Sequence, residues 1–169
     1  FPEYRRDASI SAEQLAAWHK DIQALQNPIR RDFYLFILFT GLRRQSAVEI
    51  RWEHINLDEG TLLIPNPKGG KKRAFVLPLS DFLIEVLRRR RVGNEKLTPE
   101  SPWVFSSDKS RAGHIAEPKL TPAHKAQLEV PFSVHGLRHT WVTAANAAGL
   151  SSYDIKMLTN HMLPKGDVT

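Results

Sequence analysis

Apolar residues in the first part of the chain recur at helical spacing. Leu15, Trp18 and Ile22 lie three or four positions apart, which predicts a helix that begins after the capping residue Ser11 and runs to about residue 26. Pro28 and Gly41 are a typical first residue and a typical terminating residue, and they enclose a second, more apolar helix. The same reasoning predicts further helices over residues 43–52, 81–91, 133–148 and 151–160.

The pattern changes between residues 55 and 79. Residues 61–64 and 73–79 are rich in apolar residues and enclose a turn of Pro, Gly and Lys, so they predict two strands of a small antiparallel sheet. Residues 93–126 are irregular and polar, and we expect loops with one helical stretch there. Helices followed by a small sheet and more helices predict a mostly helical α+β domain.

Composition narrows the class of protein. The 169 residues are enough for one domain with a real core. Lys and Arg number 24 against 18 Asp and Glu, a net charge of +6, which favours a polyanionic partner such as nucleic acid. The absence of cysteine excludes disulfides and thiolate chemistry. The lack of cysteine also fits an intracellular protein. No apolar stretch reaches the roughly 20 residues that span a membrane, so we expect no membrane partner.

Two separated basic motifs suggest an anion site. Arg43 follows the terminating Gly41, and His135 and Arg138 lie one helical turn apart on one face. A guanidinium matches two phosphate oxygens, and a histidine can donate or accept a proton near neutral pH. If the fold brings these side chains together, they would bind a phosphodiester. The alternative is an ion-paired helix surface.

Other basic residues are more ambiguous. Lys68 lies in the turn of residues 67–73, which could reach a DNA phosphate or merely solubilise a hairpin tip. His161, taken alone, is a solvated loop histidine. Residues 88–91 are four arginines at the end of a predicted helix, where positive charge offsets the helix dipole, and we expect them to be mainly solvated.

Several kinds of site are missing from the sequence. There is no phosphate-binding Walker loop, dinucleotide glycine pattern, zinc-binding His-Glu-x-x-His or serine-hydrolase elbow. Carboxylate clusters for two-metal chemistry are also lacking. We therefore expect no metal and no cofactor, and catalysis on phosphate by cationic side chains.

Four motifs, in this order and spacing, resemble the catalytic domain of the tyrosine recombinases, the phage integrase family. Thr40-Gly41-Leu42-Arg43 resembles the first arginine motif, and Pro67 to Lys71 resembles the β-hairpin lysine segment. The His-x-x-Arg box is matched by residues 135–140, and the later Leu-Gly-His segment by residues 158–161.

The resemblance implies a role for each matched residue. Arg43 and Arg138 would hold the non-bridging oxygens of the scissile phosphate, and His135 and His161 would hydrogen-bond to it. Lys68 would protonate the departing 5′ oxygen, with Lys71 as the alternative. The remaining implied residues are the DNA contacts Arg44, Lys71, Lys72 and Arg73, and His139, which would support the site without direct participation.

The resemblance also implies an activity. A tyrosine would attack the phosphate and form a covalent 3′-phosphotyrosyl link, which conserves the bond energy, so that neither ATP nor metal is needed. The whole protein would integrate or excise a mobile element as a homotetramer on double-stranded DNA attachment sites, in the bacterial cytoplasm at the nucleoid.

The chain departs from the family pattern in two places. Ser46 stands where the family usually has a carboxylate, and Glu49 is the candidate to orient Arg43 instead. None of the three tyrosines, Tyr4, Tyr34 and Tyr153, occupies the position of the nucleophile. We therefore expect residues 1–169 to be a catalytic-domain fragment, without the core-binding domain and the C-terminal tail, that is unable to cleave DNA and is monomeric. The alternatives are a non-catalytic DNA-binding regulator derived from the family and a type IB topoisomerase.

Overall fold

The computed structural model describes residues 9–116 and 120–160, and its centre is the helix α2 (Pro28–Thr40). The side chain of Asn27 caps this helix by accepting hydrogen bonds from the backbone N–H groups of Ile29 and Arg30. Gly41 ends it in the left-handed conformation, with a φ of 63°. Most of its side chains are buried, because other helices cover it on several sides.

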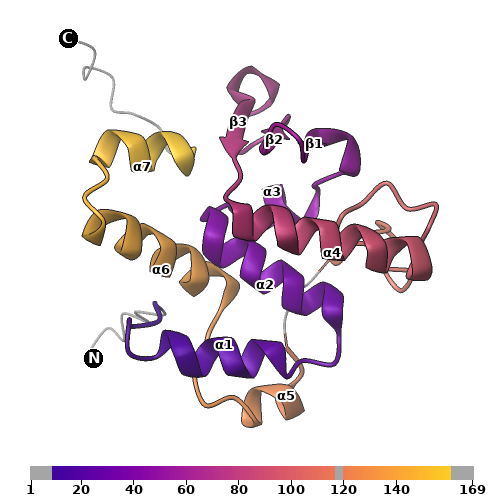
Figure 1. The fold of residues 1–169 in the computed structure, drawn as a ribbon, viewed down its shortest axis with the longest axis horizontal. Helices are drawn as coiled ribbons and strands as arrows, with labels where there is room; N and C mark the ends of the chain where they lie inside the picture. The colour runs from indigo at the N-terminus through magenta and orange to yellow at the C-terminus, as the bar shows by residue number, and fades with distance from the viewer. Residues whose placement is uncertain (1–8, 117–119, 161–169) are drawn as a thin grey trace.

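Four helices contact α2 directly (Figure 1). They are α1 (Leu15–Gln23), the short α3 (Arg44–Val48), α4 (Asp81–Leu97) and α6 (Val134–Ala147). The C-terminal α7 (Ser152–Leu158) packs on α6, and α5 (Pro122–Ala126) lies beside α1. No helix within the described ranges has both the length and the apolar character needed to cross a membrane.

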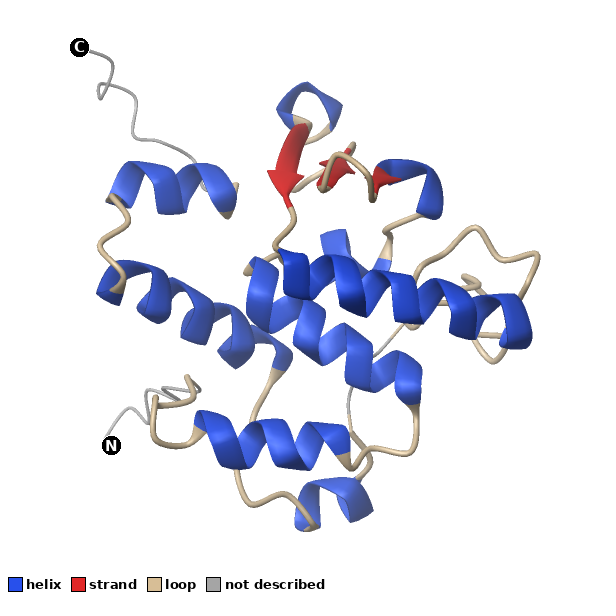
Figure 2. Ribbon diagram, in the orientation of Figure 1, coloured by secondary structure: helices blue, strands red, loops and turns tan. Residues whose placement is uncertain are grey.

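The three strands form one antiparallel sheet in the order β1 (Ile55–Asn56), β2 (Thr61–Ile64), β3 (Phe75–Pro78) (Figure 2). Leu62 pairs with Leu77 and both are buried, whereas the next pair, Leu63 and Val76, is exposed. This alternation fixes the register, because a shift by one residue would move the buried pair into solvent. A 3₁₀ turn at Lys71–Arg73 lies in the β2–β3 connection.

The fold confirms the predicted mostly helical α+β class, and the bounds of several elements differ from expectation. The helix predicted over residues 43–52 ends at Val48 and is followed by a 3₁₀ turn at Trp52–His54. Gln14, rather than Ser11, is the N-terminal capping residue of α1, although its side chain does accept from the backbone N–H of Ser11. The helix predicted to end at residue 91 continues to residue 97.

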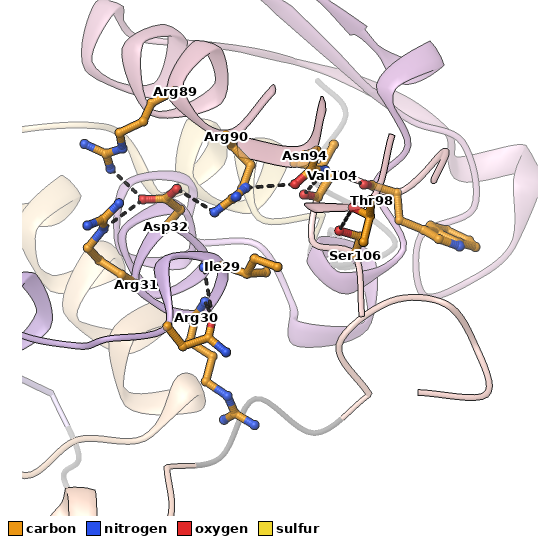
Figure 3. A network of polar contacts seen from close by, with 12 residues as sticks. Ile29, Arg30, Arg31, Asp32, Arg89, Arg90, Asn94, Thr98, Val104 and Ser106 are labelled. Atoms are coloured by element: carbon orange, nitrogen blue, oxygen red, sulfur yellow. Dashed lines mark hydrogen bonds and ion pairs between the residues drawn. The ribbon is translucent and has the colours of Figure 1, made fainter. Parts of the chain in front are cut away.

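The expectation that the arginines of residues 88–91 are solvated is wrong for Arg90. Its guanidinium is 2% exposed and donates to the fully buried carboxylate of Asp32 at 3.2 Å (Figure 3). Arg31 and Arg89 bind the other oxygen of Asp32 at 3.2 and 2.5 Å. A buried charge is tolerated when it is paired and hydrogen-bonded, and Asp32 supplies that pairing from a different helix.

The same network explains the glycine inside α4. A Cβ atom at Gly93 would lie 2.3 Å from Nη2 of Arg90, so the bare backbone makes room for the guanidinium. Arg90 also donates from Nε to the side chain of Asn94 at 3.0 Å. The amide of Asn94 in turn donates to the carbonyls of Trp103 and Val104. Asp32 and its partners thus connect α2 and α4 with the loop that follows α4.

Candidate active site

Arg43 and Arg138 come from distant parts of the chain and meet at the end of α7. Nη1 of Arg43 donates to the carbonyl oxygens of Thr159 at 3.3 Å and Asn160 at 3.1 Å. Nη2 of Arg138, on α6, donates to the same carbonyl of Thr159 at 3.0 Å. One backbone oxygen therefore receives a donor from each arginine.

Gly41 forms the other support of Arg138. Nη1 of Arg138 donates to the carbonyl oxygen of Gly41, the residue that ends α2. A Cβ atom at Gly41 would lie 2.7 Å from two ring atoms of Trp141, so the left-handed backbone and the tryptophan are in close contact. Arg43 follows two residues later in an extended conformation, where it precedes the first turn of α3. The end of α2 thus places both guanidiniums.

These residues border one depression in the surface, with a volume of about 330 Å³. It is lined by Leu42, Arg43, Arg44, Val134, His135 and Arg138. Arg138 is 7% exposed; burial, together with the positive charge of Arg43, lowers the pKa of Arg138 to about 10. Both causes disfavour the charged form, but a pKa of about 10 leaves Arg138 positive at neutral pH. An anion in this depression would relieve the repulsion.

His135 and His139 form a pair on α6 at the edge of the depression. Their Nε2 atoms are 2.8 Å apart, and the rings meet edge to face at a centroid distance of 4.4 Å. One nitrogen must donate and the other accept. Partial desolvation and the charges of His139 and Arg138 lower the pKa of His135, so that its neutral form is favoured near pH 7. A neutral ring can accept a proton.

The predicted β-hairpin residues are not part of the lining of this depression. Lys68, Lys71 and Lys72 are exposed, and none of them lines it. The side chain of Arg73 folds back over Gly69, where a Cβ atom would come within 2.6 Å of its Cδ. The predicted leaving-group acid is thus not among the residues that line the depression. His161 lies outside the described residues.

In the part of the chain that the structure describes, Glu49 makes neither a hydrogen bond nor an ion pair with Arg43. Its carboxylate accepts a hydrogen bond of 2.5 Å from the side chain of Gln45, one turn earlier. Ser46 is partly buried. The contacts that hold Arg43 come instead from backbone carbonyls of Thr159 and Asn160. Sequence reasoning missed both, because a carbonyl leaves no side-chain signal. The one available clue was Asn160, a residue type that tolerates left-handed backbone.

Among residues 9–116 and 120–160, no three or more His, Asp or Glu side chains are grouped so that they could hold a metal ion. The polar side chains that line the depression are three arginines, Arg43, Arg44 and Arg138, and one histidine, His135. This donor set is suited to a phosphate or another oxyanion. The helical domain with its small sheet and this cationic depression together define a candidate phosphoryl-transfer domain.

The sequence model of the phage integrase family matches residues 10–164, and the chain belongs to this family. It is 27% identical over 161 residues to the prophage integrase IntF of Escherichia coli K12, covering 93% of this chain and 33% of that protein. It is 29% identical over 152 residues to the tyrosine recombinase XerA of Pyrococcus furiosus, covering 80% and 48%. The chain therefore spans a third to a half of these relatives.

Solved structures share the fold. The Tn1549 transposon integrase in complex with a circular intermediate DNA superposes with a TM-score of 0.72 at 14% identity, over 95% of this chain and 60% of that one. The XerH site-specific recombinase bound to its difH substrate superposes with a TM-score of 0.68 at 22% identity, over 92% and 48%. At these identities the likeness establishes the fold.

Proposed function

We propose that this chain is the catalytic domain of a site-specific DNA recombinase that integrates or excises a mobile element. One observation carries the proposal: Arg43, Arg138 and His135, which are separated in sequence, border a single cationic depression. The family membership and the DNA-bound recombinases of the same fold give it further support. DNA strands would be cut and rejoined through a 3′-phosphotyrosyl intermediate.

The two arginines hold the scissile phosphate in this reaction. Nε and Nη2 of Arg43 make no hydrogen bond to any described residue, so they can donate to a non-bridging oxygen. Arg138 donates to the second non-bridging oxygen of the phosphate. As the tyrosine oxygen bonds to phosphorus, negative charge builds on these oxygens, and preformed cationic donors stabilise it. His135, neutral near pH 7, accepts the nucleophile's proton, and His161 hydrogen-bonds to the same phosphate.

The hairpin lysine acts on the other side of the phosphate. When the bond between phosphorus and the 5′ oxygen breaks, that oxygen must gain a proton, and Lys68 supplies it, with Lys71 as the alternative. Both lysines are exposed on the β2–β3 connection, so bound DNA must lie between this connection and the depression. Arg44, Lys72 and Arg73 contact the DNA backbone beside it.

The tyrosines that the structure describes do not fit the role of nucleophile. Tyr34 is 1% exposed on α2, and burial raises the pKa of its phenol. Tyr153 is exposed on α7 and does not line the depression. Tyr4 lies outside the described residues. We therefore propose that the chain of 169 residues grips a phosphate without cutting DNA.

The partners follow from the same proposal. The whole protein would work as a homotetramer on double-stranded attachment sites at the bacterial nucleoid, and residues 1–169 alone would be monomeric. A DNA-binding regulator without chemistry is the second candidate. Ser46 and the pairing of Glu49 with Gln45 favour it, since no carboxylate among the described residues binds Arg43.

Selection of bound DNA from a randomised duplex library tests the proposal. We expect the native chain to enrich one sequence, and the double variant Arg43→Ala/Arg138→Ala to bind it at least about tenfold more weakly, the loss of hydrogen bonds to a charged group. If the variant binds equally well, the arginines do not hold the DNA.

A nicked suicide duplex of the selected sequence then tests cleavage. We expect no covalent adduct from the 169-residue chain, and an adduct from the complete reading frame. An adduct from the chain itself would show that one of its own tyrosines attacks. A complete protein that binds without forming an adduct would be the regulator.

A further inference from the structure

Asn160 has an unusual backbone conformation directly beside the two arginines. Its φ is 49°, and among the described residues no other residue except glycine has a positive φ. Such a conformation is costly for most side chains and is tolerated best by glycine, asparagine and aspartate. The side-chain Nδ2 of Asn160 is also buried, and it has no hydrogen-bond partner among the residues that the structure describes. The conformation occurs directly after α7, at the carbonyl groups that Arg43 contacts.

The left-handed backbone at Asn160 determines the direction of two carbonyl groups. The left-handed turn follows the last residues of α7, where the N–H of Asn160 donates to the carbonyl of Met157 at 3.1 Å. It leaves the carbonyls of Thr159 and Asn160 directed at Nη1 of Arg43, and the former also at Nη2 of Arg138. An extended residue at position 160 would turn its own carbonyl elsewhere.

We propose that Asn160 is a positioning residue for the phosphate site, which acts through these carbonyls on both guanidiniums. The partial negative charge of two carbonyl oxygens offsets the repulsion between Arg43 and Arg138. The two carbonyls bind Nη1 of Arg43, so that Nε and Nη2 of that residue, which make no hydrogen bond to a described residue, can donate to a ligand. The anion would therefore meet a preorganised arginine pair, which reduces the cost of ordering these side chains on binding. This inference rests on the proposed function.

A graded series at position 160 tests the inference. Asn160→Gly should keep the turn, since glycine adopts positive φ without cost and removes the unpaired amide. Asn160→Ala and Asn160→Val should lose it progressively, because a β-branched residue is least tolerant of this conformation. The matched control is Gly149→Ala, which imposes similar strain after α6, where a Cβ atom would meet nothing within 4 Å.

Two readouts are measured on the 169-residue chain. The first is the affinity for inorganic phosphate from an NMR titration. We expect Asn160→Val to bind at least about tenfold more weakly, equivalent to the loss of one hydrogen bond to a charged group, and Asn160→Gly to match the native chain. The second is hydrogen exchange of the guanidinium N–H groups of Arg43 and Arg138, which should be faster in Asn160→Val than in Gly149→Ala.

The outcomes separate the inference from the proposed function. Weaker binding and faster exchange in Asn160→Val, with rescue by Asn160→Gly, support the inference. Unchanged guanidinium exchange in Asn160→Val overturns it. A native chain that does not respond to phosphate contradicts the proposed function, and the exchange measurement still decides the role of Asn160. If Asn160→Val does not fold, Asn160→Ala gives the same comparison at smaller amplitude.

Discussion

The substitution Gly41→Ala would change the residue that ends α2 and whose carbonyl accepts a hydrogen bond from Arg138. A methyl group at this position meets two separate costs. Alanine in the left-handed region costs about 1–2 kcal/mol. Its Cβ would also lie 2.7 Å from two ring atoms of Trp141, and such overpacking costs about 1–3 kcal/mol. We therefore expect the free energy of unfolding to fall by about 2–5 kcal/mol, the sum of these two costs.

Chemical denaturation followed by tryptophan fluorescence measures this loss, and two further variants separate its parts. Gly149→Ala carries only the backbone cost, about 1–2 kcal/mol, because its Cβ would be in open space. In Gly41→Ala/Trp141→Leu the smaller side chain should make room for the methyl group. The double variant should then be more stable than the sum of the single effects predicts, by at least about 1 kcal/mol. The reasoning fails if Gly41→Ala costs no more than Gly149→Ala.

Two further predictions concern buried and titrating groups. Asp32→Asn should lower the free energy of unfolding, measured in urea, by about 3–5 kcal/mol, because it leaves Arg90 buried without a counter-charge. Asp58→Asn, at an exposed position, is the control and should change this free energy by no more than about 0.5 kcal/mol. Equal effects of the two substitutions would contradict the role of the buried pair. In the folded chain the pKa of His135 lies below its ordinary value of 6.5, so His135 binds a proton more readily in the unfolded chain. The contribution of His135 to the free energy of unfolding is therefore lost as the pH falls below about 6.5. NMR titration should place the midpoint of His135 below 6.5, and His139→Gln should raise it; an unchanged midpoint would show that His139 is not a cause.

The predicted parts of the fold were those that local chemistry controls. Asn27 and Pro28 start α2, and the left-handed Gly41 ends it, in agreement with the sequence. Ser133 and Ser151 are the first residues of the helices predicted over residues 133–148 and 151–160, and each caps its helix by accepting a backbone hydrogen bond. Each capping residue lies within a few positions of the backbone group that it binds, so the local sequence is sufficient to predict the cap.

The errors came from partners that are distant along the chain. Arg90 belongs to a run of four arginines that looks like a solvated helix end, and its buried carboxylate, Asp32, belongs to another helix. The early end of the helix after Arg43 has a similar origin. The backbone of Ile50 accepts from Val104 and that of Trp52 donates to Pro102, so residues 50–52 pair with a distant loop instead of continuing the helix.

The amino-acid sequence by itself determined the caps of α2, α6 and α7, because each cap depends on neighbours within a few positions. It also determined the residue types of an anion site. Only the tertiary structure decided that Arg43 and Arg138 share the carbonyl of Thr159 and that Glu49 pairs with Gln45. It also showed that Lys68 does not line the depression. Hydrogen bonds to backbone carbonyls leave no trace in residue identity, and long-range packing selects which side chains meet.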